Sequence, residues 1–255
     1  MNPTVLASLS HGMWESWQQK VQEALPFFAR CPIYVEQNSL SREQFETVAR
    51  YVKDQGPIDM DGRARDAEFG GRVVNTPLGP VTRMWLDSNV EFAFLRRHLG
   101  PTLGVPRVLD IGAGYGRFAV TIAPHVKSVT CVDAVPISTA CCRDYCGRFN
   151  KAIQVPTIQE FAAKEGQSFD LAVNIHSWNE CTLEQVTNWL NVLGEMKVPF
   201  LFTVSHGTLH GPEKAYYSWN HGQPSYRPAI EARYDLVAEE ELGLSGHPHA
   251  LWRLR

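Results

Sequence analysis

Short apolar runs follow one another through the second half of the chain, and segments with helical spacing separate them. The runs read RVLDI, SVTCVD, AIQVP, FDLAVNI and FLFTVS, beginning at residue 107. Alternation of such runs with helices predicts a doubly wound α/β fold around a parallel sheet. Their near-continuous apolarity indicates that helices cover both faces of this sheet.

Two further apolar runs, RYDLVAE and HALWRL, complete the pattern at the C-terminal end. The segment between them, EELGLSGHPH, contains Gly and Pro and suits a turn between antiparallel strands. We therefore predict a Rossmann-like, mostly parallel sheet of seven strands with an antiparallel C-terminal hairpin.

Helical spacing at residues 13–29 and 41–55 predicts a small helical N-terminal region, and Ser41 suits a helix start. Residues 56–82 are rich in Gly, Pro and charge, which favours a long surface loop or cover over a strand.

A further helix is expected to begin at Asp87 or Ser88 and to end near His98, before Gly and Pro. The pattern divides the chain into a helical N-terminal region with a cover loop, residues 1–82, and an α/β domain, residues 83–255.

Composition narrows the classes of function. The 255 residues are 44% apolar and 20% charged, which is typical of a folded globular chain with one main domain. A net charge of -3 provides no broad positive field, so nucleic acid is not expected as a partner. Neither a secretion signal nor an apolar stretch of about 18 residues occurs, so we predict a cytoplasmic protein without a membrane segment.

Six cysteines are present, and we expect reduced thiols because no secretion signal precedes them. Cys142 and Cys146 are four residues apart and would share a helix face, as two metal ligands do. The same face carries an ordinary apolar stripe, in which Cys is a common small core residue. We therefore predict no metal site.

The segment VLDIGAGYGRFAV carries the strongest chemical signal. Gly112, Gly114 and Gly116 follow an apolar strand, where glycines permit positive φ and close approach of a ligand to the backbone. Asp110 precedes them, and a carboxylate there suits a cationic ligand better than a pyrophosphate. Asp133 ends the next strand, where an acid accepts hydrogen bonds from two ribose hydroxyls.

Both acids point to a ribosyl ligand with a positively charged tail. The alternative is that Asp110 and Asp133 cap the helices that follow them, for which Asp is well suited. The pair flanking three glycines favours the ligand.

These residues resemble the class I S-adenosylmethionine (SAM)-dependent methyltransferase family, whose first motif is similar to VLDIGAGYG and whose second ends in an acid like Asp133. The resemblance implies that the cofactor is SAM and that residues 83–255 form the methyltransferase domain. It also implies that Asp110, Gly112 and Gly114 hold the methionine part and Asp133 the ribose. The other cofactor-binding residues expected are Tyr115, Gly116, Ala134, Ile158, Gln159 and Asn174, with adenine near Ile158 and Gln159.

The fourth apolar run continues as NIHSWNE, which should line the acceptor side of the cleft with Asn174, His176, Trp178, Asn179 and Glu180. This segment does not resemble the Pro-Pro-aromatic motif of methyltransferases that act on nucleic-acid amino groups. It is similar instead to a group of sugar O-methyltransferases. The resemblance implies a hydroxyl of a sugar, a glycan or a similar small polar molecule as the acceptor.

An alcohol acceptor has to lose its proton, and His176 is the expected general base because of its place after the fourth run. The alternative is that it only bonds to backbone at the strand end. Glu180 is expected to assist or orient it, or else to belong to the next helix start. His206 follows the fifth run in a long loop, residues 206–229, that suits a lid. With His210 it could form a metal pair, but glycines make a helix there unlikely, so none is predicted.

Arg83, Trp85 and Asn89 precede the first strand of the sheet and are expected to shape the acceptor side of the cleft. The alternative is a structural hinge with Trp85 packed in the core. Two rival functions stay open: a protein that binds SAM without turnover, and a methyltransferase for a protein acceptor.

Overall fold

The computed structural model describes residues 12–31, 40–100, 106–206, 215–217, 224–243 and 246–255. A six-stranded sheet forms its centre, in the order β4-β3-β5-β6-β8-β7. Strands β3 to β6 run parallel, whereas β8 is antiparallel to β6 and to β7. The strands are β3 (Arg107–Ile111), β4 (Ser128–Val132), β5 (Leu171–Ile175), β6 (Phe200–Val204), β7 (Tyr234–Leu242) and β8 (His247–Leu254).

The C-terminal hairpin is present, but the prediction of seven strands was wrong. The run AIQVP contributes only one isolated bridge, in which Gln154 pairs with Thr130 beside β4. The pairing stops there because Pro156 has no N–H to donate. The next residue, Thr157, already caps a helix with its side chain.

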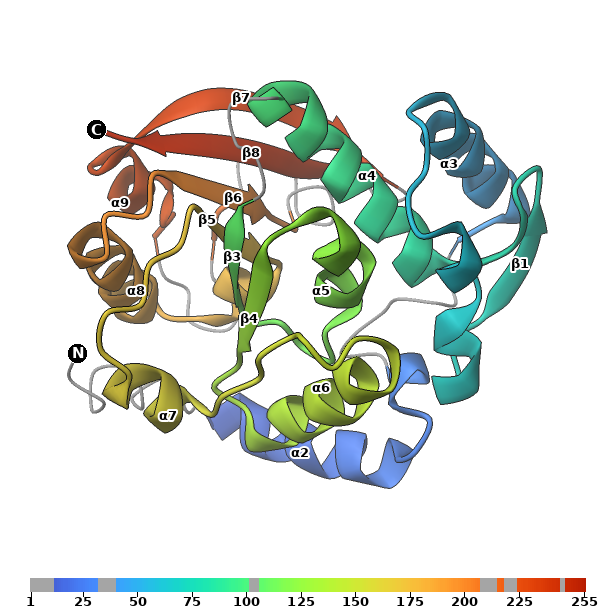
Figure 1. Ribbon diagram of the computed structural model, residues 1–255, viewed down its shortest axis with the longest axis horizontal. Coiled ribbons are helices and arrows are strands. Elements are labelled where there is room, and N and C mark those ends of the chain that lie inside the picture. Colours follow the sequence, from blue (N-terminus) through green and yellow to red (C-terminus); the bar gives the residue numbers. More distant parts are fainter. Residues whose placement is uncertain (1–11, 32–39, 101–105, 207–214, 218–223, 244–245) are drawn as a thin grey trace.

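Helices cover both faces of the sheet, because alternate residues of each strand point to opposite sides. Val108 of β3 belongs to the core cluster of one face and Leu109 to that of the other. The first face is covered by α2 (Gly12–Ala24), α4 (Arg83–Leu99), α5 (Arg117–Ile122) and α6 (Pro136–Phe149). The second is covered by α7 (Ile158–Ala163), α8 (Leu183–Glu195) and α9 (Arg227–Glu231). Figure 1 shows α4 and α5 on one side of β3 and β4, and α8 and α9 on the other.

The N-terminal region contains more strand than its composition suggested. Residues 56–82 were expected to form a loop, but β1 (Val73–Thr76) and β2 (Gly79–Thr82) pair there as an antiparallel hairpin. Gly79 has a φ of 87°, which a tight turn between the two strands requires. Val74 and Val81 pack with α3 (Arg42–Asp54) and α4 in a third core cluster.

Two helix boundaries differ from those expected. Helix α4 begins at Arg83, not at Asp87, because the Thr82 hydroxyl accepts a hydrogen bond from the Trp85 N–H. Helix α2 ends at Ala24, since Pro26 cannot continue it. Helix α3 begins as predicted, with Ser41 and Gln44 forming a capping box.

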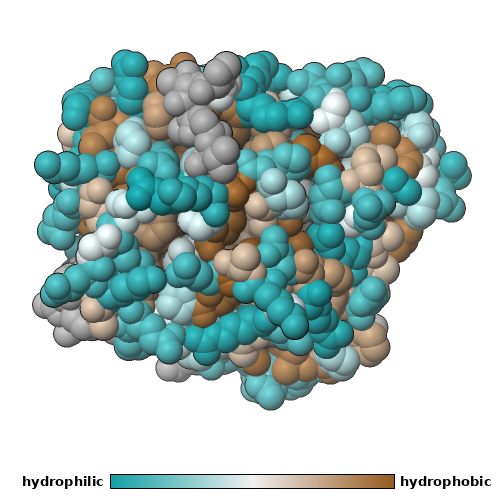
Figure 2. Space-filling model, viewed as in Figure 1, coloured by the Kyte–Doolittle hydropathy of each residue, from teal (hydrophilic) through white to brown (hydrophobic). Residues whose placement is uncertain are grey.

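The face drawn in Figure 2 is mostly polar, and its apolar side chains gather mainly near the centre. Within the described residues, no helix has both the length and the apolarity to cross a membrane.

Candidate functional site

The predicted site residues gather along one edge of the sheet, where the parallel strands end. Along this edge, in the order of the strands, lie Asp133 after β4, the glycine loop (residues 112–116) after β3, residues 174–180 at the end of β5, and His206 after β6. Strand β8 runs the other way, so its first residue, His247, lies at the same edge. Ligands of doubly wound sheets bind at this edge.

The glycine loop is folded tightly against the neighbouring strand ends. Gly112, Gly114 and Gly116 all have positive φ, between 56° and 90°. The Gly112 N–H donates to the Val132 carbonyl at 2.8 Å, which closes the loop over β4. A Cβ at Gly112 would lie 2.0 Å from the Ser177 Oγ, so only glycine fits beside that side chain.

Asp133 joins the glycine loop to the start of α6. Its Oδ2 accepts from the Gly114 N–H at 3.0 Å, and its Oδ1 accepts from the Val135 N–H at 2.8 Å. Burial raises the pKa of its carboxyl to about 6, against the effect of the two backbone donors. Each carboxylate oxygen keeps a further lone pair, so the backbone bonds leave room for two ligand hydroxyls.

Asp110 lies on β3, under the glycine loop, and is buried. Burial raises the pKa of its carboxyl to about 7, although the charge of Arg117 acts in the opposite direction. Arg117 forms a bidentate, buried ion pair with Glu91 of α4, with both N···O distances 2.7 Å. Glu91 already neutralises Arg117. A cationic ligand group beside Asp110 would lower the pKa of the Asp110 carboxyl and so favour its charged form.

Tyr115, predicted to touch the cofactor, points into the core instead. Its hydroxyl donates to Asp66 Oδ1 at 3.0 Å, and the Tyr145 hydroxyl donates to the same oxygen at 2.8 Å. Asp66 Oδ2 accepts from Thr82 at 2.9 Å. One buried carboxylate of the N-terminal region therefore fixes the glycine loop, α6 and the start of α4.

The end of β5 is held by Asn174, which is buried. Its Nδ2 donates to the Ile111 carbonyl at 2.9 Å and to Ser177 Oγ at 2.5 Å, and its Oδ1 accepts from the Trp178 N–H at 3.1 Å. These bonds lock the end of β5 to the end of β3. Asn174 thus fixes the position of these two strand ends through hydrogen bonds to the chain itself.

His176 is part of a group of three histidines, which we call the histidine cluster (His176, His206 and His247). The ring centroid of His176 lies 3.9 Å from that of His206 and 4.7 Å from that of His247. His176 has a φ of 66°, a left-handed conformation that turns its side chain at the strand end. Burial and the neighbouring histidines lower its pKa well below 6.5, and burial lowers the pKa of His247 to about 4. His176 and His247 are therefore neutral at pH 7.

Glu180 lies at the end of a 3-10 turn, Ser177–Glu180, on the side of the donor acids. Burial and the charge of Asp133 raise the pKa of its carboxyl to about 8. Among the described residues, no hydrogen bond joins it to His176. At pH 7 its carboxyl is therefore mostly protonated.

Trp178 and Asn179 of the same turn are buried. The Asn179 Nδ2 donates to the carbonyls of Ala215 and Tyr217, and its Oδ1 accepts from the His206 N–H at 3.3 Å. Asn179 therefore sets the position of His206. Of the predicted lid, residues 207–214 and 218–223, including His210, lie outside the described residues.

The expected adenine residues lie at the start of α7, where Ile158 is buried and Gln159 exposed. Ala134 packs at the edge of the core cluster of that face. The Thr157 side chain caps α7 together with Glu160.

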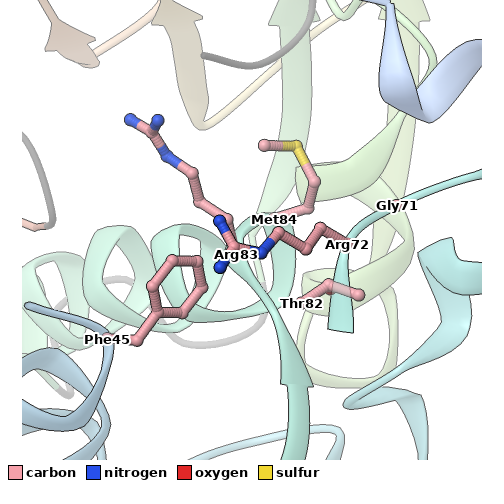
Figure 3. A pocket seen from close by; sticks show the side chains of 6 residues that line it. All are labelled: Phe45, Gly71, Arg72, Thr82, Arg83 and Met84. Carbon is pink, nitrogen blue, oxygen red and sulfur yellow. The ribbon is translucent and has the colours of Figure 1, made fainter. Parts of the chain in front are cut away.

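The three predicted residues of α4 lie in different surroundings. Trp85 is buried in the third core cluster, and its indole N–H donates to the Asp59 carbonyl at 2.9 Å. Asn89 bonds to the Ile58 N–H and to the Trp85 carbonyl. Arg83 pairs with Asp87 at 3.2 Å, and its charge contributes to lowering the pKa of the His247 imidazole. Figure 3 shows Arg83 beside a pocket lined by Phe45, Gly71, Arg72, Thr82 and Met84, with its side chain extending away from Phe45.

The cysteines of α6 are free thiols and lie in the core. Cys142 and Cys146 share a helix face as predicted, with their sulfurs 3.7 Å apart, and Cys131 of β4 lies close to both. A Cβ at Gly116 would lie 2.7 Å from the Cys146 sulfur, so the thiols pack directly under the glycine loop.

Sequence reasoning missed four residues of this edge: Asp66, Glu91, Arg117 and His247. Arg117 directly follows the last glycine of the loop, which was a usable signal. The other three reach the edge only through pairings between distant segments. Nothing in the local pattern of α4 or of the C-terminal hairpin indicates them.

These pKa shifts predict how stability depends on pH. Folded Asp110 and Glu180 hold their protons up to about pH 7 and 8, whereas the ordinary pKa values of Asp and Glu side chains are 3.8 and 4.5. The folded state therefore binds more protons than the unfolded chain, and the free energy of unfolding falls as the pH rises from about 6.5 to 8. Neutral folded histidines act in the opposite direction, but only below pH 6.5, where an unfolded histidine gains its proton.

Urea unfolding at several pH values measures this dependence. In Glu180→Gln the free energy of unfolding should fall less between about pH 7 and 8, because one proton-binding group is gone. A constant or rising free energy of unfolding between pH 6.5 and 8 would contradict the predicted proton binding.

Residues 108–196 match the family described as Methyltransferase domain. No curated protein sequence matches the chain.

Solved structures with a related fold include the N-methyltransferase NodS from Bradyrhizobium japonicum WM9, in complex with S-adenosyl-L-homocysteine, at 16% identity and a TM-score of 0.49. That alignment covers 83% of this chain and 98% of NodS. Magnesium protoporphyrin IX methyltransferase from Synechocystis PCC 6803, with bound SAM, is 13% identical with a TM-score of 0.48, over 84% of this chain and 95% of that one.

The family match begins at β3 and includes the glycine loop, Asp133 and the end of β5. Residues 108–196 thus match a methyltransferase domain, and the activity that this match indicates is methyl transfer from SAM.

Proposed function

We propose that the protein transfers the methyl group of SAM to a hydroxyl group of a sugar or of a similarly small, polar acceptor. The observation that carries this proposal is the histidine cluster, which brings three imidazoles, those of His176 and His247 neutral, to the acceptor end of the sheet edge. In the reaction the acceptor oxygen bonds to the methyl carbon, and the carbon–sulfur bond breaks with its electron pair going to sulfur. The hydroxyl proton has to leave, and neutral imidazoles accept protons.

On the donor side we assign the methionine part of SAM to Asp110 and the glycine loop, and the ribose to Asp133. The adenine would lie beside Ala134, Ile158 and Gln159. The support for this order is that β4 and β3 carry these residues at one end of the edge, while β5, β6 and β8 carry the histidines at the other. The methyl group would then lie between the two ends.

On the acceptor side we assign proton removal to the histidine cluster as a unit. The sequence alone pointed to His176 as a single base. Its ring is in contact with those of His206 and His247, so the three nitrogens act on the same small volume. Arg83, whose charge acts on His247, is the group we expect to bind acceptor oxygens, and Asn179 is a positioning residue for His206.

The test is an acceptor screen with SAM labelled in its methyl group. Free sugars, nucleotide sugars and short glycans are incubated with the protein, and the product is separated and analysed for an O-methyl group. We expect label in a hydroxyl-bearing small molecule. Label appearing only in protein or RNA would overturn the proposed acceptor class, and SAM binding without any transfer would point to a protein that binds SAM without turnover.

A further inference from the structure

The three histidines of the cluster have the arrangement of a metal-binding site. Each offers one ring nitrogen, and these three nitrogens all lie within 4.8 Å of one another. We propose that the histidine cluster binds one divalent transition-metal ion, of which Zn²⁺ is the natural probe. This proposal departs from the expectation, drawn from the sequence, that the chain holds no metal site.

The scaffold presents the rings from three neighbouring strands. His176 follows β5, and its backbone N–H donates to the carbonyl of Val204, at the end of β6, at 2.8 Å. The His206 N–H is fixed by Asn179, and the carbonyl of His247 lies 2.7 Å from His249 Nδ1. Backbone bonds at all three positions therefore limit the directions in which the rings can point.

The donor chemistry fits a transition metal. Imidazole nitrogen suits Zn²⁺ and its neighbours in the first transition row, and three histidines leave a fourth position open for another ligand. With bonds of about 2.0–2.1 Å, two nitrogens on a tetrahedral zinc ion lie about 3.3 Å apart. The nitrogens, now within 4.8 Å of one another, would have to approach by at most about 1.5 Å to reach that spacing.

A second observation concerns one nitrogen of His176. Its Nδ1 is buried and has no hydrogen-bond partner among the described residues. Buried polar atoms normally have a partner. A bound metal ion would be such a partner for this nitrogen. The nearby arginines do not oppose a cation strongly, because Arg83 pairs with Asp87 and Arg117 with Glu91.

The role of the ion, but not its binding, rests on the proposed function. The open position would take the hydroxyl oxygen of the acceptor, and the ion would lower the pKa of that hydroxyl. A ring nitrogen bound to the ion cannot accept a proton, so in the metal-bound protein the hydroxyl proton would leave to water instead of to the cluster. The oxygen would then attack the methyl carbon as described above. A metal at this place selects acceptors that offer an accessible oxygen.

The test of binding uses the full chain without a polyhistidine tag, freed of metal with a chelator. Zn²⁺ is titrated by calorimetry, and Co²⁺ is followed by its visible absorption, which reports coordination number. We expect one ion per chain, and at least about tenfold weaker binding in His206→Gln and in His247→Gln, since each removes one of three ligands. His125→Gln, an exposed histidine outside the cluster, is the matched control and should bind as the unmodified protein does.

Folding of each variant is checked by circular dichroism and by SAM binding, so loss of metal binding is separated from loss of structure. Failure of the unmodified protein to bind Zn²⁺ or Co²⁺ at one per chain would overturn the site, as would unchanged binding in folded His247→Gln. Metal binding without methylation of any small hydroxyl acceptor would support the site and contradict the proposed function. Full methylation activity after metal removal would support the function and overturn the role of the ion.

Discussion

Replacing His176 with asparagine or glutamine should lower turnover on the true acceptor by about 100- to 10,000-fold, with SAM affinity nearly unchanged. The reason is that proton removal from the hydroxyl depends on the histidine cluster, whereas the donor residues lie at the other end of the sheet edge. Asparagine is the better replacement because it tolerates the left-handed backbone at this position, where φ is 66°. Steady-state kinetics and calorimetry with SAM measure the two quantities separately.

The control for this experiment is again His125→Gln, which should retain full turnover. The pH dependence of the unmodified enzyme gives a second readout. Burial lowers the pKa of His176 well below 6.5, so the rate should already be at its plateau near pH 6.5 and fall only in more acidic solution. A folded His176→Asn protein with more than about a third of the original turnover would remove His176 from the reaction, because such a loss is far below a general-base effect.

Replacing Asp133 with alanine should weaken SAM binding by about 10- to 100-fold. The carboxylate would accept hydrogen bonds from two ribose hydroxyls, and a hydrogen bond to a charged group contributes about 1.5–3 kcal/mol. Asp133 also accepts from Gly114 and Val135, so its loss loosens the glycine loop as well. Calorimetric titration with SAM measures the affinity.

Asp133→Asn separates the two effects, since its amide oxygen still accepts one of the backbone bonds while the negative charge is gone. Thermal unfolding without SAM reports the structural part for both variants. Asp144→Ala, an exposed acid on α6, is the matched control and should leave SAM affinity unchanged. Unaltered SAM affinity in a folded Asp133→Ala protein would contradict the assignment of the ribose to this residue.

The count of strands shows how far local pattern reaches. The runs that became β3, β4, β5 and β6 were apolar along their whole length, and burial on both faces leaves few alternatives to a central strand. The run AIQVP has the same composition, yet it lies beside β4 at the edge of the sheet and pairs at Gln154 alone. Whether a short apolar run pairs fully depends on its neighbour in space, which the run itself does not encode.

Residues 56–82 show the opposite error. Gly and Pro predicted a loop, but Val74 and Val81 find an apolar surface on α3 and α4, and that contact stabilises a short hairpin. The helical start at Thr82 was missed for a similar reason: Thr82, Asp87 and Ser88 are all suitable caps, and packing of the first turn of α4 selects among them.

The sequence by itself determined the α/β class, the glycine loop and the two acids, Asp110 and Asp133. It could do so because close approach of a ligand, a tight turn and a charge at a strand end each require particular residues at short spacing. Only the tertiary structure decided which side chains meet across strands. His247 joins His176 and His206 because β8 runs antiparallel beside β6, and Tyr115 leaves the cleft because Asp66 accepts its hydroxyl. Both contacts join residues more than 40 positions apart, and such distances are set by the order and direction of the strands.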